Sequence, residues 1–299
     1  MADTIMRPCS FTRAPHESGP NRPSLMSPAN RVIVLCTGLQ GSGSSLISWC
    51  FLQRCDTDGA LDACGDAIVR PPKRAQSSIL WYKTTISSFR TIDLIRCAED
   101  DGYTVKPLLI VRDVRVAWAS LIGKPYGING TTAEDPPLRL RFRRFLDDWR
   151  TFQEHGWPIL SYEQFVRSPE ESLRTTCEAL EMSWDSGMVD WPKPAEEIAD
   201  ARHGNRTFRS SRGRNLSESL APERVEEIRH PIAQDDLAWL EREFVEFNTA
   251  HGYPRHREVP LDTVDRLVPQ FDGTRRMKWR LHQKPLKLLL HKLRGGPSR

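Results

Sequence analysis

Short apolar runs alternate with amphipathic stretches through the middle of the chain, which is the pattern of strands alternating with helices. The runs predicted to be strands are Val32–Cys36, Ser78–Tyr82, Val105–Val111 and Pro158–Tyr162. The predicted helices are one that begins near Ser44, then Phe89–Asp100, Val114–Ile122, Leu138–Phe152, Ser168–Leu180, Pro222–Arg229 and Asp235–His251. This alternation predicts an α/β fold with a doubly wound parallel sheet and a helical C-terminal half.

Proline-rich and polar stretches divide the chain into regions. Residues 1–30 hold five prolines and show no periodicity, so we expect a disordered N-terminal extension. Residues 31–255 are predicted to form one domain, because a chain of 299 residues suffices for one large core. Within it, Asp56–Gln76 is predicted to be a long surface segment, and Gly123–Pro137 a loop able to cover a pocket.

The net charge of +4 is set by the C-terminal tail, residues 256–299. From Arg275 onward there are nine Lys and Arg and no Asp or Glu, so the rest of the chain is net negative. This distribution argues against a broad nucleic-acid-binding face, and we expect no nucleic-acid partner. From Lys284 on, leucines and basic residues fall on neighbouring faces of a predicted helix, which favours peripheral contact with an anionic membrane surface. The alternative is a terminal helix docked on the body.

The seven cysteines lack the spacing of metal ligands, and we expect no metal site. Cys36 and Cys50 lie in apolar runs, where a thiol behaves as a small apolar group. Cys55 and Cys64 are able to pair, but a reduced protein is the simpler interpretation. The chain shows neither a bilayer-spanning apolar run nor the apolar core of a signal peptide. We therefore expect a cytoplasmic protein, peripheral at the inner membrane face if the tail binds there.

Three glycines and three serines fall between Gly38 and Ser45, directly after the first predicted strand. Such a loop, followed by a helix N-terminus, directs several backbone N–H groups at one point and favours a phosphate or a similar anion. The alternative is a plain strand–turn–helix connection. Gly38 and Gly43 have the spacing of the GxxxxGK nucleotide loop, but Ser44 stands where that loop has lysine, which argues against ATP hydrolysis.

Polar clusters also follow the other predicted strands, at Lys83–Thr85, Arg112–Ser120 and Tyr162–Glu163. Since ligands bind outside the carboxyl ends of parallel strands, we expect these clusters and the glycine loop to share one edge of the sheet. Arg112 offers a planar fork for a dianionic phosphate. A salt bridge to Asp113 or to a nearby helix is an equally reasonable role for it.

In these residues the chain resembles the sulfotransferases that use 3′-phosphoadenosine 5′-phosphosulfate (PAPS). Ser42–Ser45 is similar to the family's SGT loop, and the segment from Arg112 to Ser120 is similar to its RDPRDVxxS motif. Lys83–Thr85 is similar to the family's KTP, and Ser161–Phe165 with the Pro169 that follows is similar to its YEDL segment. The resemblance spans about Val32 to His251 and implies a P-loop-like, three-layer α/β/α fold with PAPS as co-substrate and no metal.

The resemblance also implies roles for individual residues. The loop would hold the 5′-phosphosulfate through Gln40, Gly41, Ser42, Gly43, Ser44 and Ser45. Arg112 and Ser120 would bind the 3′-phosphate, and Tyr162 would lie near the adenine. Arg212 belongs to an Arg-rich run, residues 206–214, that resembles the family's late basic loop over the 3′-phosphate. The equal alternative is that this run is a surface patch that recognises an anionic acceptor.

One departure from the family concerns the cation at the loop. The family places Lys or Arg directly before SGT, and this chain has Gly41 there. We predict that Lys83 offsets the charge of the leaving group, the alternative being a solvated strand-end lysine. For the general base we predict Asp62, although Asp56, Asp58 and Asp66 stand close by and each is equally a plain surface carboxylate.

These features predict a PAPS-dependent sulfotransferase that acts on a hydroxyl (or amine) of a carbohydrate, glycolipid or small molecule. A P-loop small-molecule kinase is the enzymatic alternative. The other alternative is a nucleotide-binding protein without catalysis, which the glycine at 41 motivates. The oligomeric state stays open.

Overall fold

The computed structural model describes residues 31–61, 77–86, 90–122, 138–200, 215–228, 230–254 and 261–262. The predicted extension (1–30), the predicted loop over a pocket (123–137) and most of the predicted tail lie outside these residues. Asp62 and Arg212 also lie outside them.

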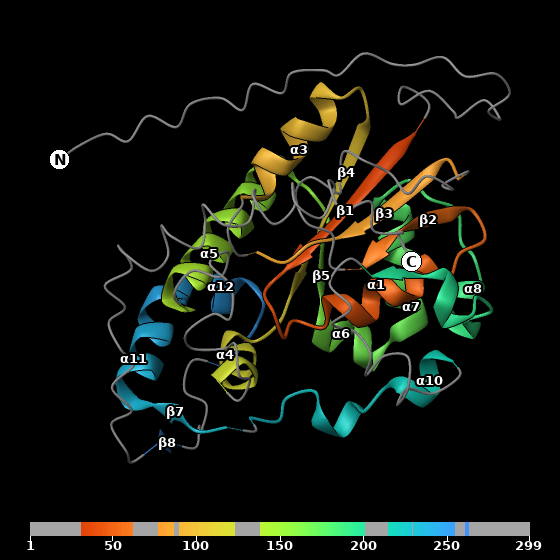
Figure 1. Ribbon diagram of the computed structural model, residues 1–299. Coiled ribbons are helices and arrows are strands. Elements are labelled where there is room, and N and C mark those ends of the chain that lie inside the picture. Colours follow the sequence, from red (N-terminus) through yellow and green to blue (C-terminus); the bar gives the residue numbers. More distant parts are fainter. Residues whose placement is uncertain are drawn as a thin grey trace, which may run out of the picture.

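The fold is built on one parallel sheet of six strands in the order β5-β4-β1-β3-β2-β6 (Figure 1). These strands are β1 (Val32–Gly38), β2 (Thr57–Leu61), β3 (Ile79–Lys83), β4 (Thr104–Val111), β5 (Ile159–Ser161) and β6 (Ala199–Asp200). A second, two-stranded parallel sheet pairs β7 (Ile232–Ala233) with β8 (Leu261–Asp262).

Helices cover both faces of the large sheet, which gives three layers (Figure 1). One face carries α1 (Ser44–Leu52), α6 (Tyr162–Arg167), α7 (Pro169–Ala179), α8 (Gly187–Asp190) and α10 (Leu216–Ser219). The other carries α3 (Thr91–Asp100), α4 (Val114–Ile122), α5 (Leu138–His155), α11 (Gln234–Glu243) and α12 (Val245–Ala250). Among the described residues, single-turn 3₁₀ helices lie at Ala195–Glu197 and Pro222–Arg224.

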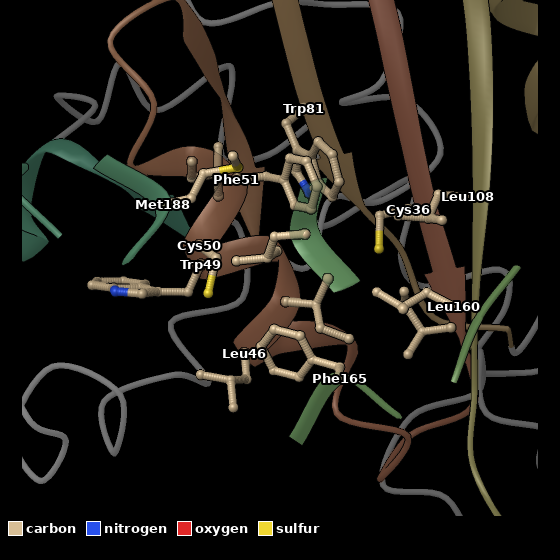
Figure 2. Close-up of a cluster of buried hydrophobic side chains, with 14 of the residues drawn as sticks. Cys36, Leu46, Trp49, Cys50, Phe51, Trp81, Leu108, Leu160, Phe165 and Met188 are labelled. Atoms are coloured by element: carbon tan, nitrogen blue, oxygen red, sulfur yellow. The ribbon is translucent and has the colours of Figure 1, made fainter. Parts of the chain in front are cut away.

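The alternation of side chains along the strands explains the two-sided core. In β1, Val34 and Cys36 face α1, whereas Ile33 and Leu35 face α3, and all four are fully buried. On the α1 face the rings of Phe51 and Trp81 stack with centroids 4.1 Å apart (Figure 2). The predicted doubly wound α/β fold is therefore confirmed.

The structure differs from several predictions of local structure, among them a single helix at Asp235–His251, where α11 and α12 are separate helices. Thr57–Leu61 lies in the predicted surface segment but forms β2, because Gly59 lets the backbone pack against Trp81, where a Cβ atom would lie 1.8 Å from the carbonyl oxygen. Tyr162 begins α6 instead of ending a strand, since the Ser161 hydroxyl caps that helix by accepting from the Gln164 N–H. The helix predicted at Pro222–Arg229 is a single 3₁₀ turn.

The sheet order places the topological switch point of the fold, called the crevice below, at the carboxyl ends of β1 and β4. The connection after β1 leads to α1 on one face, and that after β4 leads to α4 on the other. Neighbouring strands whose connections leave in opposite directions form the switch point where open α/β sheets bind ligands. The glycine loop follows β1 and Arg112 follows β4, so both lie at this switch point.

Candidate functional site

The glycine loop begins with a tight turn between β1 and α1. The Ser42 N–H donates to the Leu39 carbonyl at 3.1 Å, and Gly41 has φ +87°. A positive φ at the third residue is the mark of a type II turn and favours glycine. Gly43, with φ +84°, then starts α1. The backbone of this loop therefore depends on glycine at two positions.

The loop also holds an unsatisfied hydroxyl next to unpaired helical N–H groups. The Oγ atom of Ser42 is buried and has no hydrogen-bond partner among the described residues. The first N–H groups of a helix such as α1 have no partner within the helix. A hydroxyl donor and helical N–H groups are the donors that an anion accepts from, so this loop fits a phosphate-like group.

Arg112 connects the carboxyl end of β4 to the loop. Its Nη1 donates to the Gly41 carbonyl at 3.0 Å, and its Nη2 donates to the Val225 carbonyl at 2.6 Å. Its Cζ lies 4.7 Å from the centroid of the Tyr162 ring, a cation–π distance. Arg112, Gly41 and Tyr162, which the sequence predicted to share a site, are thus in contact.

Asp113 is paired with Arg115, whereas Arg112 bonds the Gly41 and Val225 carbonyls. Both carboxylate oxygens of Asp113 accept from the Arg115 guanidinium at 2.9 Å, and Arg115 also donates to Glu241 at 2.8 Å. Glu163 accepts from the Asp113 N–H at 2.9 Å and from Tyr253. These buried bonds hold the turn after β4, and with it the backbone that carries Arg112.

Ser120 lies against the loop and explains why the loop lacks a basic residue. A Cβ atom at Gly41 would lie 3.2 Å from the Ser120 Oγ, which is tighter than ordinary contact. The positive φ disfavours any side chain there as well. A lysine at this position would therefore be strained.

Lys83 lies beside the end of β1, as predicted. It is paired with Cys36 in the sheet register, and the next residue, Thr84, donates its N–H to the Cys36 carbonyl at 2.8 Å. The Lys83 side chain is buried, and its Nζ donates to the Thr85 hydroxyl at 3.2 Å. Burial raises the pKa of the Cys36 thiol to about 12, and the nearby Lys83 charge opposes this shift. A buried ammonium group thus lies near the strand end that leads into the loop.

Two of the alternative carboxylates lie away from this edge. Asp56 precedes β2 and forms an ion pair with the buried Arg54 at 2.7 Å. Asp58 is the second residue of β2 and accepts from the Ser77 N–H at 3.0 Å. Because β2 runs parallel to β1, its first residues lie at the opposite edge from the loop. Asp56 and Asp58 are therefore not placed to serve as the base.

Arg141 is a site residue that the sequence predictions missed. It lies in α5, is buried, and donates from Nη1 to the Oε1 of Gln40 in the loop at 2.6 Å. Its spacing was an available signal, since it falls three residues after Leu138 and four before Phe145, on the apolar face of that helix. An arginine on an apolar face needs a polar partner.

Two observations bear on other kinds of site. Within the part of the chain that the structure describes, no group of three His, Cys, Asp or Glu is arranged to hold a metal ion. None of the described helices has the length and apolar content that crossing a bilayer requires.

Comparisons with known proteins found similar folds at low identity. No protein-family model and no curated protein matches the chain. The sulfotransferase domain of the Synechococcus PCC 7002 olefin synthase is 16% identical, with a TM-score of 0.48 over 75% of this chain and 98% of that one. The sulfotransferase domain of the curacin biosynthetic pathway is 14% identical, with a TM-score of 0.44 over 77% and 99%. Mouse sulfotransferase SULT7A1, complexed with PAP, is 14% identical, with a TM-score of 0.39 over 76% and 88%. Likenesses of this size do not distinguish one function from another within a fold.

Proposed function

We propose that this chain is a PAPS-dependent sulfotransferase that acts on a hydroxyl (or amine) of a carbohydrate, glycolipid or small molecule. The observation that carries the proposal is the position of Arg112 at the switch point, hydrogen-bonded to the Gly41 carbonyl and stacked on Tyr162. It brings together residues of three of the four resembling motifs, the glycine loop, the segment from Arg112 to Ser120 and the segment from Ser161 to Phe165, and this supports the proposal.

The residues at this crevice fit PAPS. The buried Ser42 hydroxyl and the start of α1 suit the 5′-phosphosulfate, while Arg112 and Ser120 suit the 3′-phosphate. PAPS supplies a sulfuryl group on a phosphate that is a good leaving group. In this proposal Lys83 offsets the negative charge that the departing phosphate gains, because a buried ammonium stabilises developing charge more than a solvated one does. Asp62 is the proposed base and would take the acceptor proton.

A nucleotide-binding protein without catalysis is the second candidate, and the glycine at 41 favours it. The backbone φ of +87° and the contact with Ser120 disfavour the loop cation that the resemblance implies. The two candidates differ only in turnover, since both bind the same nucleotide.

Nucleotide selectivity followed by a transfer assay tests the proposal. Calorimetry of the full chain with adenosine 3′,5′-bisphosphate (PAP), ADP and ATP should give the tightest binding to PAP. PAPS with a labelled sulfuryl group is then incubated with a panel of saccharides, glycolipids and small alcohols or amines. Transfer of the label to an acceptor should give a product. Tight PAP binding without product across the panel would favour the non-catalytic candidate, and a preference for ATP with magnesium would favour a kinase.

A further inference from the structure

Arg141 is a buried cation that reaches the glycine loop from the opposite side of the sheet. Its side chain comes from α5, among the apolar residues Leu138, Phe142 and Phe145, and only 1% of the residue is exposed. Moving a guanidinium into such surroundings is costly unless hydrogen bonds satisfy it. The contact that joins Arg141 to the loop is the 2.6 Å bond from Nη1 to the Oε1 of Gln40.

This bond fixes the orientation of the Gln40 amide. An arginine guanidinium has donors and no acceptor, so it can bond only the oxygen of the amide. The NH₂ group of Gln40 is then left to donate to another acceptor. Because the short bond to a charged donor is strong, rotation of the amide is restricted. Gln40, which is half-buried, thus has its oxygen occupied by Arg141 and its N–H donors available for a ligand.

Gln40 is also the loop position next to the missing cation. It is the second residue of the turn Leu39–Ser42, and Gly41 after it cannot carry a side chain without strain. A donor at residue 40 is therefore the nearest replacement that the loop backbone permits.

We propose that Arg141 is a positioning residue that holds Gln40 so that its NH₂ group donates to the anionic 5′-phosphosulfate of PAPS. This inference rests on the proposed function. In this proposal Gln40 is a neutral donor that takes the place of the Lys or Arg that the family has at residue 41. The buried Arg141 cation holds Gln40 in position. The Gln40 donor then strengthens binding of the 5′ group of the nucleotide. It does not strengthen binding of the 3′-phosphate, which Arg112 and Ser120 would hold.

The test compares two ligands that differ only at the 5′ position, PAP and adenosine 3′-monophosphate. Calorimetry of the full chain gives the ratio of their affinities, the 5′ preference, for wild type, Arg141→Met, Gln40→Met and the double variant. Each single variant should lower the 5′ preference by about tenfold, the effect of one hydrogen bond to a charged group, and the double variant should lose no more than either. Affinity for adenosine 3′-monophosphate should stay within about twofold.

Matched variants separate positioning from folding. Arg143→Met, on the exposed face of the same helix, should leave the 5′ preference unchanged. Gln40→Glu keeps an oxygen for Arg141 but lacks the NH₂ group, so it should lower the 5′ preference while thermal unfolding stays the same. If Arg141→Met does not fold, the Gln40 variants carry the test alone.

Three results would overturn the inference. They are an unchanged 5′ preference in Gln40→Met or Gln40→Glu, an unchanged 5′ preference in a folded Arg141→Met, and losses that multiply in the double variant. If wild type itself shows no preference for PAP over adenosine 3′-monophosphate or ADP, the proposed function fails and this inference fails with it. A normal wild-type preference with unaffected variants would reject the inference alone.

Discussion

The ring of Tyr162 lies directly on the backbone of Gly43, so that a Cβ atom at residue 43 would fall 2.0 Å from Cδ2 of the ring. The same ring carries the Arg112 guanidinium on it. The first residue of α6 thus connects the start of α1 with the cation at the end of β4. The packing of the Tyr162 ring between the Gly43 backbone and the Arg112 guanidinium sets the shape of the crevice.

Gly43→Ala should disrupt this packing. The added methyl group meets the ring, and the residue also has φ +84°, so both the free energy of unfolding and PAP affinity should fall. Gly156→Ala is the matched control, because Gly156 has φ +63° but nothing within 4 Å of its Cβ position. That control should cost about 1–2 kcal/mol in denaturant unfolding from backbone strain alone. Equal losses in the two variants would contradict the contact between Tyr162 and Gly43.

Arg115→Met should be among the most destabilising single changes in the domain. It leaves the buried Asp113 carboxylate without its bidentate partner, which for buried pairs costs about 3–5 kcal/mol. Arg174→Met, which removes an exposed pair with Glu170, should cost less than about 1 kcal/mol. Urea unfolding measures both. A small effect of Arg115→Met would mean that the turn after β4 is held by other contacts.

Asp148 should make stability fall as the pH rises through the weakly acidic range. Burial raises the pKa of this carboxyl from 3.8 to about 6, although bonds from the Thr91 N–H and hydroxyl oppose the shift. The folded state therefore binds the proton more tightly than the unfolded state, so this contribution is fully present below pH 3.8 and is lost by about pH 6.

Asp148→Asn keeps an oxygen that accepts from Thr91 and cannot ionise. The difference in unfolding free energy between wild type and this variant should shift in the variant's favour between pH 4 and 6, the window between the ordinary and the raised pKa. The difference should be flat above it. A flat difference across the whole range would show that the Asp148 pKa is not raised.

Lys83→Met should lower sulfuryl transfer and have less effect on nucleotide binding. Removing one electrostatic stabiliser of developing charge costs about 10²–10³ in turnover. Lys83→Arg should recover part of the rate, because it restores the charge at this buried position. Single-turnover transfer from labelled PAPS measures the rate, and calorimetry with PAP measures the binding. Unchanged turnover in Lys83→Met would assign the leaving-group charge to another cation.

Most of the fold, and the grouping of the crevice residues, could be predicted from the sequence. Apolar periodicity indicated the larger helices and four of the strands, and the rule that ligands bind at carboxyl ends brought Arg112, Ser120 and the loop together. β2 was missed because Asp58 and Gly59 disfavour a strand by propensity, and only the packing of Gly59 on Trp81 accounts for it.

The partners of charged residues were the part that the sequence did not reveal. Asp113 stands next to Arg112 and two residues from Arg115, and sequence distance does not decide between them. The turn after β4 and the start of α4 direct the carboxylate at Arg115. Similarly, Arg141 on an apolar helix face indicates a buried partner but does not name Gln40, which lies 101 residues away in the chain.

In the proposed function Arg112 binds the 3′-phosphate of a PAPS-type nucleotide, and a ratio of two affinities measures this role. Because Arg112 also bonds the Gly41 and Val225 carbonyls, its removal loosens the loop and weakens all nucleotides, so absolute affinity is a poor measure. Calorimetry of wild type and Arg112→Ala with PAP and with adenosine 5′-monophosphate gives the preference for the 3′-phosphate. Wild type should show a strong preference that falls by about tenfold or more in the variant. An equal preference in both proteins, or none in wild type, would contradict it.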